Sequence, residues 1–111
     1  LYHVLSLRPE SVKDIISNIN KVFDHRIRLG IMSVLVVNEH QDFLTLKNLL
    51  GVTDGNLASH LKALEQEKFI LAEKRFIGKK PNTRYLATAA GKKAFEAHLQ
   101  ALEKLIKNSH H

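Results

Sequence analysis

The chain has 111 residues, of which 44% are hydrophobic and 25% charged, the composition of one ordinary globular domain with a modest core. The absence of cysteine excludes a disulfide framework, a thiolate metal site and a catalytic thiol. No apolar run is long enough to cross a membrane. Residues 1–7 lack the basic start and long apolar core of a secretory signal, so we expect a cytoplasmic protein. The closing pair, residues 110–111, is interpreted as the remnant of an affinity tag.

Positive charge is concentrated in one short segment. The formal net charge is +6, from 17 Lys and Arg against 11 Asp and Glu. Five of these cations lie within residues 74–84, which contain no acid, namely Lys74, Arg75, Lys79, Lys80 and Arg84. A solvated loop could carry such a cluster, but basic clusters commonly bind phosphate. The segment is therefore a candidate phosphate-binding arm.

Two helices are predicted before residue 42. Ser11 can cap a helix over residues 12–23, whose apolar side chains are spaced by three and four. Asp24 can cap a second helix that ends around residues 38–41 and is apolar on more than one side, which predicts a central, buried position. A short extended piece is expected at residues 42–44.

A pair of helices joined by a tight turn is predicted over residues 45–67. Thr45 can cap the first, which spans residues 46–50, and Gly51 suits the left-handed residue that ends it. Thr53 can cap the second, which spans residues 53–67. Leucines on the two segments can face each other: Leu46, Leu49 and Leu50 against Leu57, Leu61 and Leu64. This pattern is typical of a helix-turn-helix.

The face of the second helix opposite its leucines is small and polar. Counted at about 100° per residue, it holds Gly55, Ser59, Lys62 and Gln66 and is flanked by Asn56 and Ala63. A recognition helix enters a major groove about 12 Å wide with its N-terminal residues nearest the bases. Gly55 would remove bulk there, while Asn56 can read adenine, Lys62 can read guanine or meet a phosphate, and Ser59 can serve either. An ordinary surface helix with a loose first turn is the alternative.

A basic β-hairpin is predicted directly after this helix. The stretches "ILAEKRF" and "TRYLAT" each favour a strand, and "IGKKPN" between them has the Gly, Pro and Asn of a turn. The basic segment found from charge is thus the tip of a hairpin over residues 70–88. A basic hairpin that follows a recognition helix is a wing.

These motifs together resemble the winged-helix transcriptional regulators of the MarR/ArsR kind. The chain is most similar to a small single-domain subgroup with the pattern Gly-Asn-Leu-x-x-His-Leu-x-x-Leu-Glu, then Pro-x-Thr-x-Tyr, then Thr-x-x-Gly, here starting at Gly55, Pro81 and Thr88. "DHRIRLGIM" is similar to the family's second helix, and the resemblance covers roughly residues 12–106. Lys68 stands where the family usually has Gly, so we expect that turn to differ locally.

The resemblance implies a mainly α (α+β) fold, a winged helix-turn-helix with a two-stranded wing and N- and C-terminal dimerisation helices. It implies a dimeric regulator that binds double-stranded DNA, with no cofactor. The candidate DNA-binding residues are Thr53, Gly55, Asn56, Ser59, His60, Lys62, Lys79, Lys80, Thr83 and Arg84.

A long amphipathic helix is predicted over residues 88–108. Thr88 can cap it, and its apolar face is wider than a small domain can cover. We therefore expect a two-fold dimer that sets two recognition helices one DNA turn, about 34 Å, apart. Packing of this helix on its own domain alone is the alternative. The candidate dimerisation residues are Ile15, Ile19, Phe95, Leu99, Leu102 and Ile106.

No catalytic or metal site is expected. His60 is next to Ser59, but adjacent helical residues do not face each other, and no two histidines before residue 110 stand three or four apart. Membrane binding through the wing would require an amphipathic basic helix, which the wing lacks. The sequence therefore predicts a sequence-specific regulator of transcription that binds a palindromic operator as a homodimer, and not an enzyme. A protein-interaction module on the same fold stays open, as do the operator, the genes, the sign of regulation and any small-molecule effector.

Overall fold

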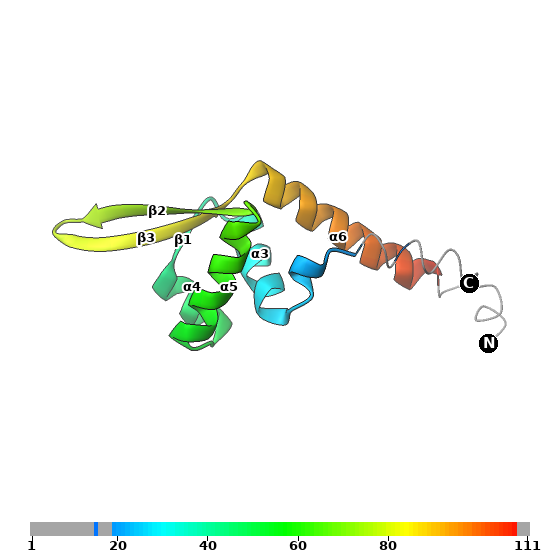
Figure 1. The fold of residues 1–111 in the computed structure, drawn as a ribbon, viewed down its shortest axis with the longest axis horizontal. Helices are drawn as coiled ribbons and strands as arrows, with labels where there is room; N and C mark the ends of the chain where they lie inside the picture. Colours follow the sequence, from blue (N-terminus) through cyan, green and yellow to red (C-terminus); the bar gives the residue numbers. More distant parts are fainter. Residues whose placement is uncertain (1–14, 16–18, 109–111) are drawn as a thin grey trace.

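The computed structural model describes residue 15 and residues 19–108. Its elements are η1 (Lys21–Phe23), α3 (Arg26–Val37), β1 (Gln41–Asp42), α4 (Phe43–Leu50), α5 (Asp54–Gln66), β2 (Ile70–Ile77), β3 (Lys80–Ala87) and α6 (Ala89–Asn108). The strands form an antiparallel sheet in the order β1-β3-β2. The β2–β3 hairpin and α6 leave the group formed by α3, α4 and α5 in opposite directions (Figure 1). This is the predicted α+β winged helix-turn-helix.

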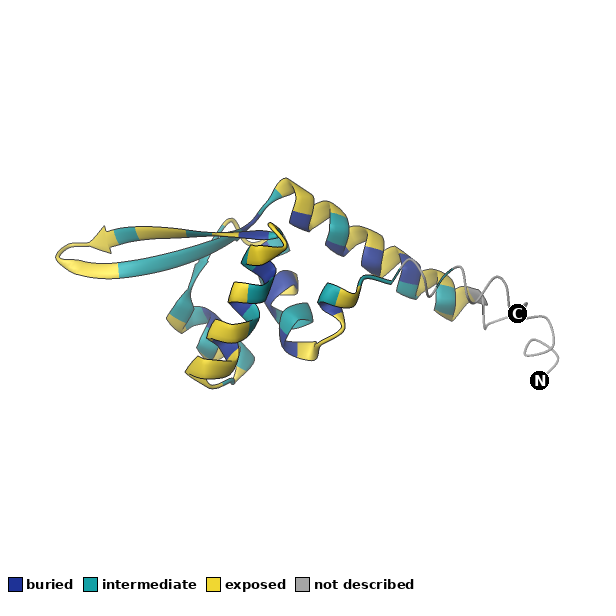
Figure 2. Ribbon diagram, viewed as in Figure 1, coloured by how far each residue is buried: buried dark blue, intermediate teal, exposed yellow. Residues whose placement is uncertain are grey.

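The core lies where α3, α4, α5 and the root of the hairpin meet (Figure 2). Helix α3 is its centre, as its broad apolar surface predicted, because adjacent residues Ile31 and Met32 are both fully buried. The other fully buried large side chains are Phe23, Leu35, Leu46, Leu57, Leu61, Leu64 and Ile70. None of the helices within residues 19–108 is long and apolar enough to serve as a membrane span.

Two helices begin at other caps than the sequence predicted. His25, not Asp24, caps α3, because its Nδ1 accepts the N–H of Ile27 at 3.1 Å. Asp42, not Thr45, caps α4: its carboxylate accepts the N–H of Thr45 at 2.8 Å. Hydrogen bonds from Thr45 hold the pKa of Asp42 below its usual value. Since Asp42 is kept extended by pairing with β3, α4 starts at once after it, and the expected extended piece at residues 42–44 shrinks to Gln41–Asp42.

Of the helix predicted over residues 12–23, only Ile15 and residues 19–23 lie among the described residues. Ile15 is helical, but the helix does not run through to Phe23. Asn20 is extended, and its side chain accepts the N–H of Val22 at 2.9 Å, which starts the short η1. An Asn side chain competes in this way with the backbone bonds of a helix. The N–H of Asn20 in turn donates to Nδ1 of His98 on α6 at 3.1 Å, and burial lowers the pKa of His98.

Thr88 and Gly91 fix where α6 begins. The Thr88 hydroxyl accepts the N–H of Gly91 at 2.9 Å and donates to the carbonyl of Lys68 at 2.8 Å, while the Thr88 N–H donates to the carbonyl of Phe69 at 3.0 Å. A Cβ at position 91 would lie 2.0 Å from that Phe69 oxygen, so only glycine allows the approach. The predicted cap at Thr88 is confirmed, and it ties α6 to the end of α5.

The turn at Lys68 keeps the conformation that a glycine would adopt, against expectation. Lys68 has φ +63°, in the left-handed region. The N–H of Phe69 donates to the carbonyl of Leu64 at 3.0 Å and that of Lys68 to Glu65 at 2.9 Å, the two bonds of a Schellman motif. The contacts around the turn therefore impose its geometry on a residue that favours it less than glycine does.

We predict that Lys68→Gly raises the free energy of unfolding by about 1 kcal/mol, because glycine enters the left-handed region without a Cβ clash. The melting temperature should rise by about 4 °C for a domain of this size. Lys68→Ala is the matched control, since it also removes the charge but keeps the strain. Thermal melts of the three proteins check this, and a glycine variant that melts no higher than the alanine variant would contradict it.

Candidate nucleic-acid interface

The helix-turn-helix is built from α4, α5 and the three residues between them. Gly51 has φ +62° and ends α4 as predicted, with its N–H donating to the carbonyl of Lys47 at 2.9 Å. Thr53 caps α5, since its hydroxyl accepts the N–H of Asn56 at 3.3 Å. Lys47 also reaches across the turn to pair with Asp54 at 2.8 Å. The first turn of α5 is thus held both by its cap and by α4.

Helix α5 buries one side and exposes the other, as predicted (Figure 2). Leu57, Leu61 and Leu64 are buried, and the opposite face exposes Gly55, Asn56, Ser59, Lys62 and Gln66. Among the described residues, no hydrogen bond or ion pair engages the side chains of Asn56, Ser59 and Lys62. These groups are therefore free to meet a ligand.

Gly55 has no structural reason to be glycine inside the protomer. Its backbone does not lie in the left-handed region, where Gly51 and Gly78 do. A Cβ built at position 55 meets no atom of the described residues within 4 Å. Neither a backbone angle nor a close neighbour within the fold therefore requires the missing side chain.

His60 turns inward, away from the exposed face. Nε of Arg28 donates to its Nδ1 at 3.0 Å, and its ring centroid lies 4.1 Å from that of His25. Burial, together with the nearby charges of His25 and Arg28, lowers the pKa of His60. His60 thus links α5 to the start of α3, and its role as a DNA contact stays a prediction. Within the described part of the chain, no three His, Asp or Glu side chains gather as metal ligands would.

The hairpin spans the predicted residues, but its strands are longer and its turn is tighter than the sequence indicated. Gly78, with φ +63°, and Lys79 form the turn, and β3 already begins at Lys80. Pro81 lies in the strand opposite Phe76. Proline is tolerated there because β1 pairs only with residues 84 and 85, so at position 81 β3 has a neighbour on one side only.

The cations of the hairpin fall into two groups. Arg84 pairs with Glu73 at 2.6 Å, and Nε of Arg75 donates to Asn82 at 3.0 Å. The second group is exposed and makes no ion pair within residues 19–108; it consists of Lys74, Lys79 and Lys80. Lys74 lies opposite Thr83, which is half-buried. Counting charge missed the pairing of Arg84 because Glu73 lies one residue outside the acid-free segment, and it missed that of Arg75 because Asn82 is uncharged. The free charge is therefore carried by lysines.

The candidate dimerisation residues divide between the inside and the outside of the protomer. Phe95 is buried, edge-on to Phe23 with ring centroids 5.5 Å apart, so it belongs to the protomer's own core. Leu99 and Ile106 on α6 are exposed, and Ile15, Ile19 and Leu102 are half-buried. A groove of about 540 Å³ between α3 and α6 is lined by Ser33, Val36, Val37, Lys92, Phe95, Glu96 and Leu99.

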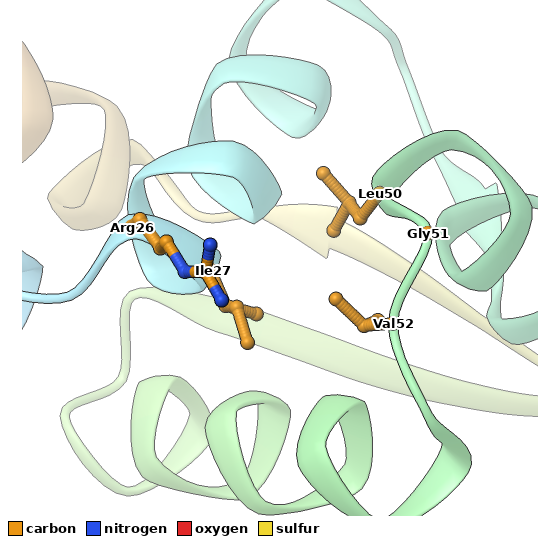
Figure 3. A pocket seen from close by; sticks show the side chains of 5 residues that line it. All are labelled: Arg26, Ile27, Leu50, Gly51 and Val52. Atoms are coloured by element: carbon orange, nitrogen blue, oxygen red, sulfur yellow. The ribbon is translucent and has the colours of Figure 1, made fainter.

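A smaller pocket of about 240 Å³ lies beside the turn of the helix-turn-helix. Figure 3 shows Arg26 and Ile27 of α3 on one side of it and Leu50 and Val52 on the other, with Gly51 between the latter two. Leu50 also packs directly on α3, since a Cβ at Gly30 would lie 2.7 Å from its Cδ2. The pocket therefore marks a gap between the two helices and not the exposed face of α5.

Comparison with known proteins agrees with this architecture. The family model for the winged helix DNA-binding domain, which describes the sequences of that family, matches residues 27–106. An uncharacterised protein of Methanocaldococcus jannaschii is 35% identical over 88 residues, which cover 79% of this chain and 96% of that protein. The solved structure of a transcriptional regulator homologue from Pyrococcus horikoshii matches with a TM-score of 0.80 and 27% identity, over 92% of this chain and 99% of that one.

A more distant solved structure shares the fold alone. It is BpsR of Bordetella bronchiseptica, whose DNA binding is regulated by 6-hydroxynicotinic acid, with a TM-score of 0.65, 10% identity, and 96% and 81% of the two chains covered. The chain belongs to the family of winged-helix DNA-binding domains and has the fold of MarR-like transcriptional regulators.

Proposed function

We propose that this protein is a sequence-specific transcriptional regulator that binds double-stranded DNA as a homodimer in the cytoplasm, without a cofactor. Helix α5 would enter the major groove, and the β2–β3 hairpin would contact the backbone or the minor groove. The observation that carries the proposal is the exposed polar face of α5, where Asn56, Ser59 and Lys62 are unengaged although the rest of the helix is fixed by its leucines and caps. A rigid helix with free polar groups is what base reading requires.

The chemistry of this face suits a duplex. Asn56 can make two hydrogen bonds to adenine, Lys62 can donate to guanine or a phosphate, and Ser59 can bond to either kind of group. Thr53 and Gly55 lie at the start of the helix, where free N–H groups favour an anion such as a phosphate. The same start is exposed, so a backbone could reach it.

A second copy of the chain would cover the apolar groove between α3 and α6. Val37 is 81% exposed and Leu99 46% exposed, both on that groove. Apolar surface of this kind is typical of protein–protein contacts. Ile15, Ile19, Leu102 and Ile106 would extend the contact along α6 and the N-terminal segment. Two-fold symmetry would then match a palindromic operator.

Alanine substitutions at Asn56, Ser59 and Lys62 test the proposal. We expect the removal of each base-reading side chain to cost about 1–3 kcal/mol on the preferred duplex and little on a scrambled one, with unchanged melting temperatures, because these side chains are exposed. Titrations of both duplexes at fixed salt provide the measurement. Equal losses on both duplexes would assign the side chains to phosphates, and a wild-type protein that binds no duplex would favour the protein-interaction module.

The hairpin lysines should act through charge. We predict that Lys79→Ala with Lys80→Ala weakens binding to all duplexes alike and flattens the dependence of log K on log salt by about 0.9 for each phosphate that is no longer neutralised. Lys104→Ala is the control, since Lys104 is exposed on the far part of α6. Titration at several salt concentrations checks this, and a slope equal to that of the wild type would mean that these lysines do not touch the backbone.

Substitutions at Gly55 should affect the stability of the protein and its affinity for DNA differently. Because a Cβ there meets only open space, Gly55→Ala should stabilise the free protein by up to ~1 kcal/mol, alanine being the better helix former. Gly55→Leu should fold as well, but its bulk should hold α5 away from the groove and weaken binding. Thermal melts and duplex titrations of both variants decide the matter. Lower melting temperatures in both would show that the fold itself needs the glycine.

A further inference from the structure

The tip of the hairpin carries large apolar side chains far from the core. Phe76 is 73% exposed and Ile77 55% exposed, and both lie where only β2 and β3 pair with each other (Figure 1). Phe76 lies directly opposite Pro81, so the two rings share one face of the hairpin. Nothing else in the described part of the chain packs on this tip. The ring of Phe76 is therefore available to a partner outside the protomer.

The face that carries Phe76 is the one turned toward the recognition helix. Side chains alternate along a strand, so Phe76 shares its face with Ile70 at the root of β2, which is buried in the core with α5. Tyr85 of β3 is on this face too, and burial, together with the charge of Glu65 on α5, raises its pKa. A duplex on the exposed side of α5 would therefore meet the Phe76 face of the hairpin.

Charge identifies the kind of partner. The unpaired Lys74 shares the face of Phe76 and Lys79 lies in the turn, while Lys80, opposite Ile77, belongs to the other face of the same tip, so the tip that carries the ring is basic on both faces. A complementary surface has apolar edges inside and negative charge at its rim. The minor groove of duplex DNA has this chemistry, with sugar and base edges lining a slot about 6 Å wide between two rows of phosphates. Apolar wedges from Phe and Pro enter minor grooves in other proteins and unstack a base step.

We propose that Phe76, supported by Pro81, enters the minor groove as an apolar wedge that bends the duplex, while Lys79 and Lys80 hold the phosphates on either side. This inference rests on the proposed DNA-binding function. In this proposal the hairpin binds DNA through two kinds of interaction, one electrostatic and one apolar. The lysines supply binding that weakens with salt, whereas burial of the Phe76 ring supplies binding that does not.

The test compares Phe76→Ala, Phe76→Leu and Ile77→Ala with the wild-type protein on one duplex labelled with a dye pair at its ends. Affinity is measured at several salt concentrations, and bending is measured from energy transfer between the dyes. Ile77→Ala is the matched control, because Ile77 is an exposed apolar residue of the same hairpin on the opposite face. All three variants should fold, since the substituted side chains are exposed.

We expect Phe76→Ala to weaken binding about tenfold with an unchanged salt slope and to reduce the bend. Phe76→Leu should keep most of both, and Ile77→Ala should resemble the wild type. Wild-type affinity and bending in Phe76→Ala, a loss of affinity with the bend intact, or equal losses in Ile77→Ala would each overturn the wedge while leaving DNA binding in place. A wild-type protein that binds no duplex would overturn the proposed function as well.

Discussion

The hydrogen bond from the Thr88 N–H to the carbonyl of Phe69 holds three parts of the protein at one point. Phe69 connects the end of α5 to β2, and Thr88 connects the end of β3 to α6. Gly91 packs directly against the same carbonyl, and Lys68 closes the turn before it in a left-handed conformation. The directions of α5, the hairpin and α6 are therefore set by one small group of backbone contacts. In a dimer built on α6, the spacing between two recognition helices would depend on this junction.

Some polar side chains tie elements of the protomer together, and others on its surface engage no partner among the described residues. His60 is held by Arg28, and Arg84 is held by Glu73. Asn56 and Lys79, by contrast, are exposed on the faces that we assign to DNA. These pairs restrain α5 and the hairpin, so less ordering would be needed on binding of a duplex. The protomer thus combines elements that are held by paired side chains with exposed side chains that have no partner among the described residues.

Features governed by neighbouring residues could be predicted from the sequence. The caps at Thr53 and Thr88, the left-handed Gly51 and the exposed face of α5 are local consequences of side-chain chemistry and helical spacing, and the structure confirms them. Features governed by distant residues could not. Asp42 caps α4 because β3 holds it extended, and His60 turns inward to a residue 32 positions away. The charge count likewise could not show that Arg84 is engaged across the hairpin.

Selection of bound duplexes from a random pool at physiological salt tests the central claim most directly, because it examines sequence reading and symmetry together. If α5 reads bases from two sides of a two-fold axis, the pool should converge on a palindrome whose half-sites are centred about one helical turn apart. Convergence should be lost when the face formed by Gly55, Asn56, Ser59 and Lys62 is replaced. A pool that stays random although the protein binds it would contradict the account, since the protein would then recognise only the DNA backbone.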